Sequence, residues 1–136
     1  MEEQLIKEET AILAKEIGFI LGIGWFGIDY YKFYYNGQLT DNYRGNNPVA
    51  CTQSLLQKYL RKEHNCHVEV TYYGSDIKEL KDIKYSVEVN YYGKNFQIPI
   101  TKDADIEKWG FLTYEDALEY GLFEAMKLIK AHEILP

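Results

Sequence analysis

Hydrophobic residues recur every three or four positions in three stretches of the chain and at every second position in two others. The first spacing is that of a helix with one buried stripe, and the second is that of a strand with one buried face. The pattern predicts an α+β fold with the element order α-(β)-α-β-β-β-α. We expect an antiparallel sheet of three or more strands, covered on one face by the second and final helices, with the N-terminal helix packed beside them.

The N-terminal helix is predicted over residues 3–17. Gly18 suits a left-handed helix end, and Phe19 is then the apolar residue that folds back on the last turn. The helix is followed by a segment rich in Gly and Tyr, over residues 19–47. We expect one or two strands there, with a hairpin turn at Asn36-Gly37, and then a loop from residue 40. The apolar stripe of the helix consists of Leu5, Ile6, Ile12, Leu13 and Ile17.

A second helix is predicted over residues 48–64, and its ends are marked by polar residues. Asn47 suits the N-cap, and Pro48 suits the first helical position because its missing N–H needs no partner there. Asn65 suits a left-handed exit. The buried stripe consists of Leu55, Leu56, Tyr59 and Leu60.

The final helix is predicted over residues 114–131. Thr113, followed three residues later by Asp116, is typical of a capping box. Gly121 in mid-helix costs about 1 kcal/mol relative to Ala, so we expect it where the helix crosses the sheet closely. The buried stripe consists of Leu118, Leu122, Ala125 and Ile129.

Three strands are predicted between these two helices. Residues 67–73 and 85–92 alternate between apolar and polar, and a turn at Gly93-Lys94 leads to a third strand over 95–100. Pro99 has no N–H to donate, so this strand is expected at an edge. Such an edge would let two copies pair, so the chain is expected to be a monomer or an edge-strand homodimer.

Nothing in the sequence divides the chain into separate units. No Pro- or Ser-rich linker is present, so residues 1–136 are expected to form a single domain. Within it, residues 1–47 hold the N-terminal helix and the Gly/Tyr-rich segment, and residues 48–131 hold the α-β-β-β-α core.

Composition narrows the classes of function. The formal net charge of −6 argues against attraction to nucleic acid or to an anionic membrane. The 13 tyrosines suit a sheet-rich core or an aromatic surface. No apolar run approaches the roughly 20 residues of a membrane-spanning helix, and residues 1–4 lack the basic start of a secretory signal. We therefore expect a cytoplasmic protein.

Two motifs resemble sites of known chemistry. Residues 22–27 match the GxGxxG spacing, but that loop must follow a strand and open a helix to bind a dinucleotide, and here it follows a helix. His64, Cys66 and His67 offer zinc-type ligands, yet a fourth would have to come from Cys51 or His132. We interpret the first motif as a glycine-rich turn and the second as a helix end followed by a strand.

Catalysis by a thiol is the enzymatic alternative. Cys66 with His67 would need an orienting group nearby, and Cys51 is expected in the first turn of a helix, where a thiol pKa can fall. Because no convergent set is readable, we assign no catalytic, cofactor-binding or metal-binding residue and expect a protein that is not an enzyme.

Acidic residues gather towards the C-terminal helix. Residues 101–119 hold six acids against two lysines, a local charge of −4. They indicate either a solvated acidic face, a docking face for a basic partner or a weak cation site, and they do not match the twelve-residue calcium loop. The acids are Asp103, Asp105, Glu107, Glu115, Asp116 and Glu119.

The order helix, three strands, helix is also that of double-stranded-RNA-binding domains. Those domains contact phosphates from basic residues at the start of the final helix, where this chain has Glu115 and Asp116. The dense basic cluster lies instead on the second helix, at Lys58, Arg61 and Lys62. Nucleic acid is therefore the alternative partner, and Tyr73 and Tyr92 are candidates for stacking on single-stranded bases.

Two segments resemble a known group of sequences. Residues 52–61 read TQSLLQKYLR, and residues 113–129 read TYEDALEYGLFEAMKLI. As a pair they resemble short uncharacterised proteins of phages and integrated elements of gut bacteria, with Tyr59 in place of the usual Trp. The resemblance covers roughly residues 50–130 and implies a small cytoplasmic accessory protein, with no catalytic residues to transfer. The expected function is thus non-catalytic binding of a protein partner through acidic and Tyr-bearing surfaces, including Tyr73, Tyr92 and Trp109.

Overall fold

The computed structural model describes residues 4–19, 32–40, 47–72, 85–96, 111 and 113–134. This part of the chain contains three helices and two three-stranded antiparallel sheets, which confirms the predicted α+β class. In chain order the elements are α1 (Glu8–Glu16), β1 (Lys32–Tyr35), β2 (Gln38–Thr40), β3 (Val49–Ala50), α2 (Gln53–Glu63), β4 (Cys66–Tyr72), β5 (Tyr85–Tyr91), β6 (Lys94–Phe96) and α3 (Tyr114–Ile134).

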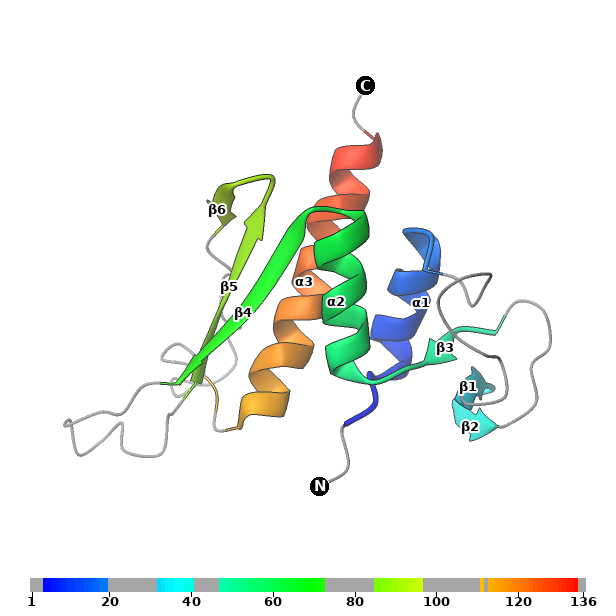
Figure 1. Ribbon diagram of the computed structural model, residues 1–136. Helices are drawn as coiled ribbons and strands as arrows, with labels where there is room; N and C mark the ends of the chain where they lie inside the picture. Colours follow the sequence, from blue (N-terminus) through cyan, green and yellow to red (C-terminus); the bar gives the residue numbers. More distant parts are fainter. Residues whose placement is uncertain are drawn as a thin grey trace.

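The helices form a layer between the two sheets (Figure 1). In the larger sheet, of strand order β4-β5-β6, both β4 and β5 pack against α3, and α2 packs against β4. On the side away from this sheet, α1 packs against α3 and contacts β3 of the smaller sheet, β2-β1-β3. The predicted three-stranded meander, covered by the second and final helices with the first helix beside them, is therefore confirmed.

The core forms where the apolar stripes of the helices meet the inner face of the larger sheet. In β4 and β5 the residues on this face alternate with polar residues such as Glu69 and Glu88, which are exposed and lie directly opposite each other. Alternation of this kind is what one buried face requires. The fully buried core side chains include Val68, Val89, Phe33, Leu56, Leu60, Leu118, Leu122, Met126 and Ile129.

Gly121 lies where α3 crosses the larger sheet. A Cβ at this position would lie 2.4 Å from Val87 Cγ2 and 2.8 Å from Val68 Cγ1. Both distances are well below van der Waals contact. The predicted close crossing is confirmed, and it explains why the helix accepts a residue with low helix propensity here.

The second helix begins later than predicted. Gln53 is its first residue, and Thr52 is the N-cap, whose hydroxyl accepts the Leu55 N–H at 3.3 Å. The proposed caps Asn47 and Pro48 precede β3, which pairs with β1. The prediction was wrong because a strand-forming pair, Val49–Ala50, was counted as helix. The left-handed exit at Asn65 is confirmed by its φ of 48°.

The first helix is also shorter than predicted. Residues 4–7 lie beside residues 51–53, where the Ile6 N–H donates to the Cys51 carbonyl at 2.9 Å and the Gln53 N–H donates to the Gln4 carbonyl at 3.0 Å. This pairing competes with helix formation, so α1 begins only at Glu8. The buried stripe of α1 therefore differs from the predicted one: Ile12 is 44% exposed, and Thr10 and Ala11 are buried. The left-handed helix end at Gly18, with the Phe19 N–H on the Ala14 carbonyl, is confirmed.

The β1–β2 and β5–β6 hairpins each turn on a pair of residues with positive φ. The predicted turn at Asn36-Gly37 is confirmed, with φ of 52° and 78°. Between β5 and β6, however, the turn is Tyr92-Gly93 rather than Gly93-Lys94, with φ of 53° and 79°. Lys94 is paired with Tyr91 and belongs to β6. β6 is the terminal strand in the sheet order, as predicted, while residues 97–100 with Pro99 lie outside the described residues.

The final helix begins as predicted and continues three residues further. The Thr113 hydroxyl accepts the Asp116 N–H at 3.1 Å, so Thr113 is the N-cap. The helix ends at Ile134 rather than at residue 131. Neither α3 nor the other described helices have the length and apolar character that crossing a membrane requires.

We expect the substitution Gly121→Ala to destabilise the fold by about 2 kcal/mol. Overpacking of a tight contact costs roughly 1–3 kcal/mol, which exceeds the gain in helix propensity of about 1 kcal/mol. Urea unfolding followed by circular dichroism measures the change. Adding Val87→Ala should recover part of the loss, because it removes the methyl groups nearest to the new Cβ. An unfolding free energy of G121A equal to or above that of the parent would contradict the close crossing.

Candidate functional site

The carboxylate of Glu119 lies at the point where the N-terminal ends of α1 and α2 meet α3. It is 5% exposed and has three hydrogen-bond donors within the described residues. Oε2 accepts the Lys7 N–H at 2.9 Å and the Thr10 hydroxyl at 2.5 Å. Oε1 accepts Nε2 of Gln53 at 2.9 Å. Thus a single side chain from α3 contacts both other helices.

Glu119 supplies the cap that α1 lacks. Lys7, the N-cap residue of α1, makes no side-chain capping hydrogen bond of its own. The carboxylate accepts its N–H instead, at the end of the helix where the dipole favours negative charge. Gln53, the first residue of α2, also donates to the Glu115 carbonyl in the first turn of α3 at 3.0 Å. The buried charge is thereby stabilised by hydrogen bonds and the helix dipole rather than by a salt bridge within the described residues.

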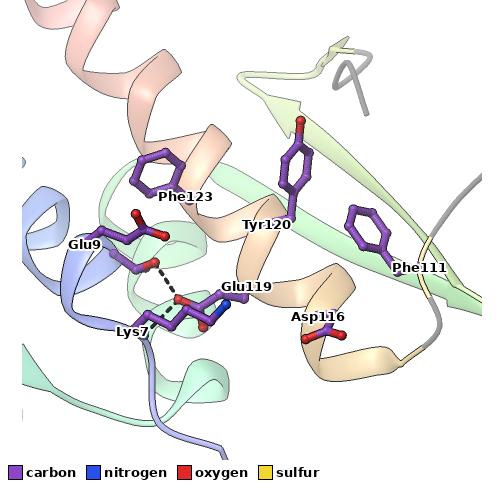
Figure 2. Close-up of a pocket in the computed structure, with 8 residues that line it drawn as sticks. Lys7, Glu9, Phe111, Asp116, Glu119, Tyr120 and Phe123 are labelled. Carbon is purple, nitrogen blue, oxygen red and sulfur yellow. Dashed lines mark hydrogen bonds between the residues drawn. The ribbon is translucent and has the colours of Figure 1, made fainter. Parts of the chain in front are cut away.

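A hollow of about 350 Å³ opens outside this cluster, between the start of α1 and the first half of α3 (Figure 2). We call it the acidic hollow. Its polar lining comes from Glu9, Asp116 and Glu119, with Lys7 and Thr10. Its aromatic lining comes from Phe111, Tyr120 and Phe123. Three carboxylates against one ammonium give the lining a negative charge.

The acidic residues of the hollow differ in what they can bind. Glu119 is enclosed and committed to three donors, so it contributes charge to the hollow rather than a free ligand. Glu9 and Asp116 are exposed, and their carboxylates lie at the rim, one on α1 and one on α3. A ligand entering the hollow would meet these two carboxylates first.

A row of tyrosines continues from the hollow to the end of the larger sheet. Tyr72 of β4 pairs directly with Tyr85 of β5, with ring centroids 5.4 Å apart, and Tyr85 lies 6.1 Å from Tyr114 of α3. The backbone of Tyr85 is joined to Phe111 by two hydrogen bonds, and Phe111 contacts Tyr120 in the hollow. Tyr72 is 64% exposed and Tyr114 is 42% exposed. The tyrosine row (Tyr72, Tyr85 and Tyr114) thus extends the aromatic wall of the hollow outward.

The structure does not bring His64, Cys66 and His67, the zinc-type ligands weighed in the sequence, together. Cys66 is fully buried on the inner face of β4, and His67 follows it on the opposite face. His64 ends α2 and lies 3.4 Å from the Tyr59 hydroxyl. Across the described residues, no group of three or more His, Cys, Asp or Glu side chains is placed to hold a metal ion.

Both cysteines lie in environments that disfavour a thiolate. Burial raises the pKa of Cys51 to about 12 and that of Cys66 to about 12. Cys51 also precedes α2 instead of lying in its first turn, so the predicted effect of the helix on its pKa was wrong. Neither thiol has the exposure or the lowered pKa of a nucleophile.

Several sequence candidates lie outside the described residues. They are the GxGxxG segment 22–27, the acids Asp103, Asp105 and Glu107, and the aromatic residues Tyr73 and Trp109. Of the candidates that are described, Tyr92 is 64% exposed, and Lys58, Arg61 and Lys62 are exposed on α2. These three basic residues do not line the acidic hollow.

The sequence analysis grouped Glu119 with the acidic residues but did not predict its burial. Glu119 follows Leu118 and precedes Leu122 by three positions, so helical spacing places it beside the buried stripe. The burial of Thr10 and Gln53 could not be predicted in the same way, because polar residues of helices are usually exposed. Their role depends on α1 and α2 starting beside the same residue of α3.

No model of a known protein family, no curated protein and no solved structure matches this chain. The functional assignment therefore depends on the geometry of the described residues.

We expect Glu119→Ala to destabilise the fold by about 3 kcal/mol. The substitution leaves the Lys7 N–H and the Thr10 hydroxyl without an acceptor, while the Gln53 amide keeps only the Glu115 carbonyl, and each buried donor that loses its partner costs roughly 1–3 kcal/mol. Urea unfolding measures the loss. Glu119→Gln, which keeps one acceptor oxygen, should lose less, and Glu124→Ala on the exposed ion pair of α3 should lose at most about 1 kcal/mol. We call the three hydrogen bonds accepted by the Glu119 carboxylate the clamp. Equal stability of E119A and E124A would contradict a stabilising role of the clamp.

We expect both thiols of the folded protein to react slowly with iodoacetamide at pH 8 and rapidly in urea. Each folded pKa lies above the ordinary value of 9.0, so the unfolded chain loses these protons first as the pH rises. The contribution of the thiols to stability is therefore complete below pH 9 and declines between pH 9 and about 12. Mass spectrometry of the alkylated protein follows the reaction. Modification of native Cys66 as fast as that of a free thiol would restore the enzymatic alternative.

Proposed function

We propose that this protein is a non-catalytic binding protein that takes a basic segment of a protein partner in the acidic hollow. The observation that carries the proposal is the convergence of Glu9, Asp116 and Glu119 with three aromatic side chains around one hollow (Figure 2). Carboxylates attract a guanidinium or ammonium group, and aromatic faces bind such cations when they are partly desolvated. A basic side chain is therefore the ligand that both parts of the lining favour.

The rim and the floor of the hollow would act differently on a basic side chain. Glu9 and Asp116 are exposed at the rim, where they can pair directly with Arg or Lys. Glu119 adds a charge that solvent screens less, because its carboxylate is enclosed. Tyr120 and Phe123 supply ring faces, and Lys127 already lies 5.6 Å from the Phe123 centroid on the outer side of α3. This contact is an example within the chain of the recognition that we propose.

The tyrosine row adds contact area for a protein partner beyond what the acidic hollow alone offers. Tyr is enriched at protein interfaces because its ring offers a large contact area and its hydroxyl remains compatible with water. Tyr72 and Tyr114 are both exposed large hydrophobic side chains. A partner segment that enters the hollow past Phe111 would continue along this row.

The chemistry of the remaining candidates supports binding over catalysis. The two thiols have raised pKa values through burial, and the carboxylate of Glu119 is engaged by three donors. The resemblance of residues 50–130 to short proteins of phages and integrated elements of gut bacteria supports a role as a small accessory protein. We propose that it acts on a protein of the host cell or of the mobile element, in the cytoplasm.

Nucleic acid is the second candidate, because α2, β4, β5, β6 and α3 follow the order of a double-stranded-RNA-binding domain. Lys58 and Arg61 are exposed on α2, as such a role would need. Against it, Glu115 and Asp116 lie in the first turn of α3, where they would repel phosphate. A salt-sensitive shift of labelled duplex RNA that disappears in the double variant Lys58→Glu/Arg61→Glu would support this alternative over the acidic hollow.

Fluorescence anisotropy with labelled peptides tests the proposed function. We expect an Arg- and Lys-rich peptide to bind and a matched peptide with Glu in place of each basic residue not to bind. The double variant Glu9→Gln/Asp116→Asn should weaken binding about tenfold or more, because two charge-assisted contacts are lost. Tyr120→Ala should weaken it as well.

A matched control separates recognition by the hollow from attraction to the net charge. The double variant Glu69→Gln/Glu88→Gln also removes two negative charges, but from the outer face of the larger sheet. Its affinity should equal that of the parent. Equal weakening by both double variants would show general electrostatic attraction and would overturn the proposal.

A further inference from the structure

A second hollow, of about 360 Å³, lies at the opposite end of α3 from the acidic hollow. It is formed by the β5–β6 hairpin and the C-terminal part of α3, which lie at the same end of the molecule (Figure 1). Its lining consists of Tyr91, Tyr92, Lys94, Phe96 and His132. We call it the ring hollow, because four of these five residues carry an aromatic ring.

The rings of Tyr92 and His132 both pack against Tyr91, with centroids 4.9 Å and 5.4 Å from it. The Tyr92 and His132 rings are inclined to each other by 32°, with centroids 6.4 Å apart. A planar group that stacks on both faces needs about 7 Å between them, since each stacking contact takes roughly 3.5 Å. His132 is packed edge to face against the buried Tyr91, at 5.4 Å, whereas Tyr92 is 64% exposed. Rotation of the exposed Tyr92 side chain would therefore widen the distance between the Tyr92 and His132 rings to the roughly 7 Å that a stacked group needs.

The charge of the ring hollow is opposite to that of the chain as a whole. Among the described residues its lining contains no acidic side chain, and Lys94 and His132 are both exposed. Lys94 Nζ lies 5.4 Å from the Phe96 centroid, and both residues line the ring hollow. In a protein of net charge −6 this hollow is a local site for an anionic group.

Tyr92 adopts a backbone conformation that its side chain does not favour. Its φ is 53°, in the left-handed region, and it occupies the first position of a two-residue hairpin turn where Asn, Asp or Gly is usual. For a bulky residue this conformation is strained. The ring packs on one side against Tyr91, with centroids 4.9 Å apart, but 64% of the residue is exposed, so much of the ring remains accessible to a ligand. The turn between β1 and β2 has Asn36 at the equivalent position.

We propose that the ring hollow binds a nucleoside phosphate, with the base stacked between Tyr92 and His132 and the phosphate next to Lys94. Exposed aromatic rings stack on a planar base, and an adjacent ammonium recognises a phosphate. The phosphate belongs either to a free nucleotide or to the 5′ end of a nucleic-acid strand, which present the same chemistry. This site lies apart from the acidic hollow and goes beyond the proposed binding of a protein partner.

Isothermal titration calorimetry with AMP, adenosine and ribose 5-phosphate tests the two halves of the site separately. We expect AMP to bind best, with adenosine weaker by about tenfold because the contact with Lys94 is lost. Ribose 5-phosphate, which has no base to stack, should bind more weakly still. A Kd for AMP weaker than about 1 mM, or equal affinity for AMP and adenosine, would overturn the proposal.

Variants with matched controls locate the binding. Tyr92→Asn suits the left-handed turn and removes the stacking ring, so it should keep or raise stability and weaken AMP binding about tenfold or more. Lys94→Gln should reduce affinity for AMP but leave that for adenosine unchanged. The controls Tyr35→Ala and Lys58→Gln remove an exposed Tyr and an exposed Lys elsewhere and should keep the parental affinity. Loss of binding in a control as large as in Y92N or K94Q would contradict the site.

A short RNA with and without a 5′ phosphate distinguishes the two sources of the ligand. Tighter binding of the 5′-phosphorylated strand than of AMP assigns the site to a strand end, and the reverse order assigns it to a free nucleotide. Binding of both RNAs with equal affinity, unchanged in K94Q, would contradict a phosphate contact at Lys94.

Discussion

The hydrogen bonds of the Glu119 carboxylate determine how the three helices meet. A carboxylate that leaves water loses several kcal/mol of hydration unless donors replace it. Here the Lys7 N–H, the Thr10 hydroxyl and the Gln53 amide replace it. The arrangement satisfies the cap of α1, holds the first residue of α2 and orients both against α3. A change in the start of either helix would leave one of these groups buried and unpaired.

The position of α1 in turn shapes the smaller sheet and the acidic hollow. Residues 4–7 run beside residues 51–53 to reach the clamp, and the hydroxyl of Tyr34 in β1 donates to the Ile6 carbonyl at 2.6 Å. Burial raises the pKa of this Tyr34 hydroxyl, and the negative charge of Glu119 is the second cause of the rise. The same path places Glu9 opposite Asp116, so the rim of the hollow depends on the clamp beneath it (Figure 2). At its other end α1 is joined to α3 by the exposed pair Glu16–Lys130, which contributes little to stability.

Along α3 the two ends carry contrasting surfaces. The first half of α3 borders the acidic hollow and the tyrosine row. The second half borders the ring hollow, which contains Lys94 and His132. Between them, Gly121 and the apolar stripe pack closely on the sheet. One helix therefore lines two hollows of contrasting charge, each formed with a different partner element: α1 at one end and the β5–β6 hairpin at the other.

Local sequence patterns are sufficient to predict the α+β class, the two long amphipathic helices, the meander and the close approach at Gly121. Each of these follows from local periodicity or from one residue with a strong preference, such as Thr113 at a cap or Gly18 at a helix end. Tertiary structure alone decided the starts of α1 and α2, where pairing of residues 4–7 with 51–53 prevailed over the helical pattern. It also decided the two hollows, because Glu9 with Asp116, and Tyr92 with His132, are distant in sequence and meet only through packing. Local patterns carry no information about such contacts, since they depend on how whole elements are placed.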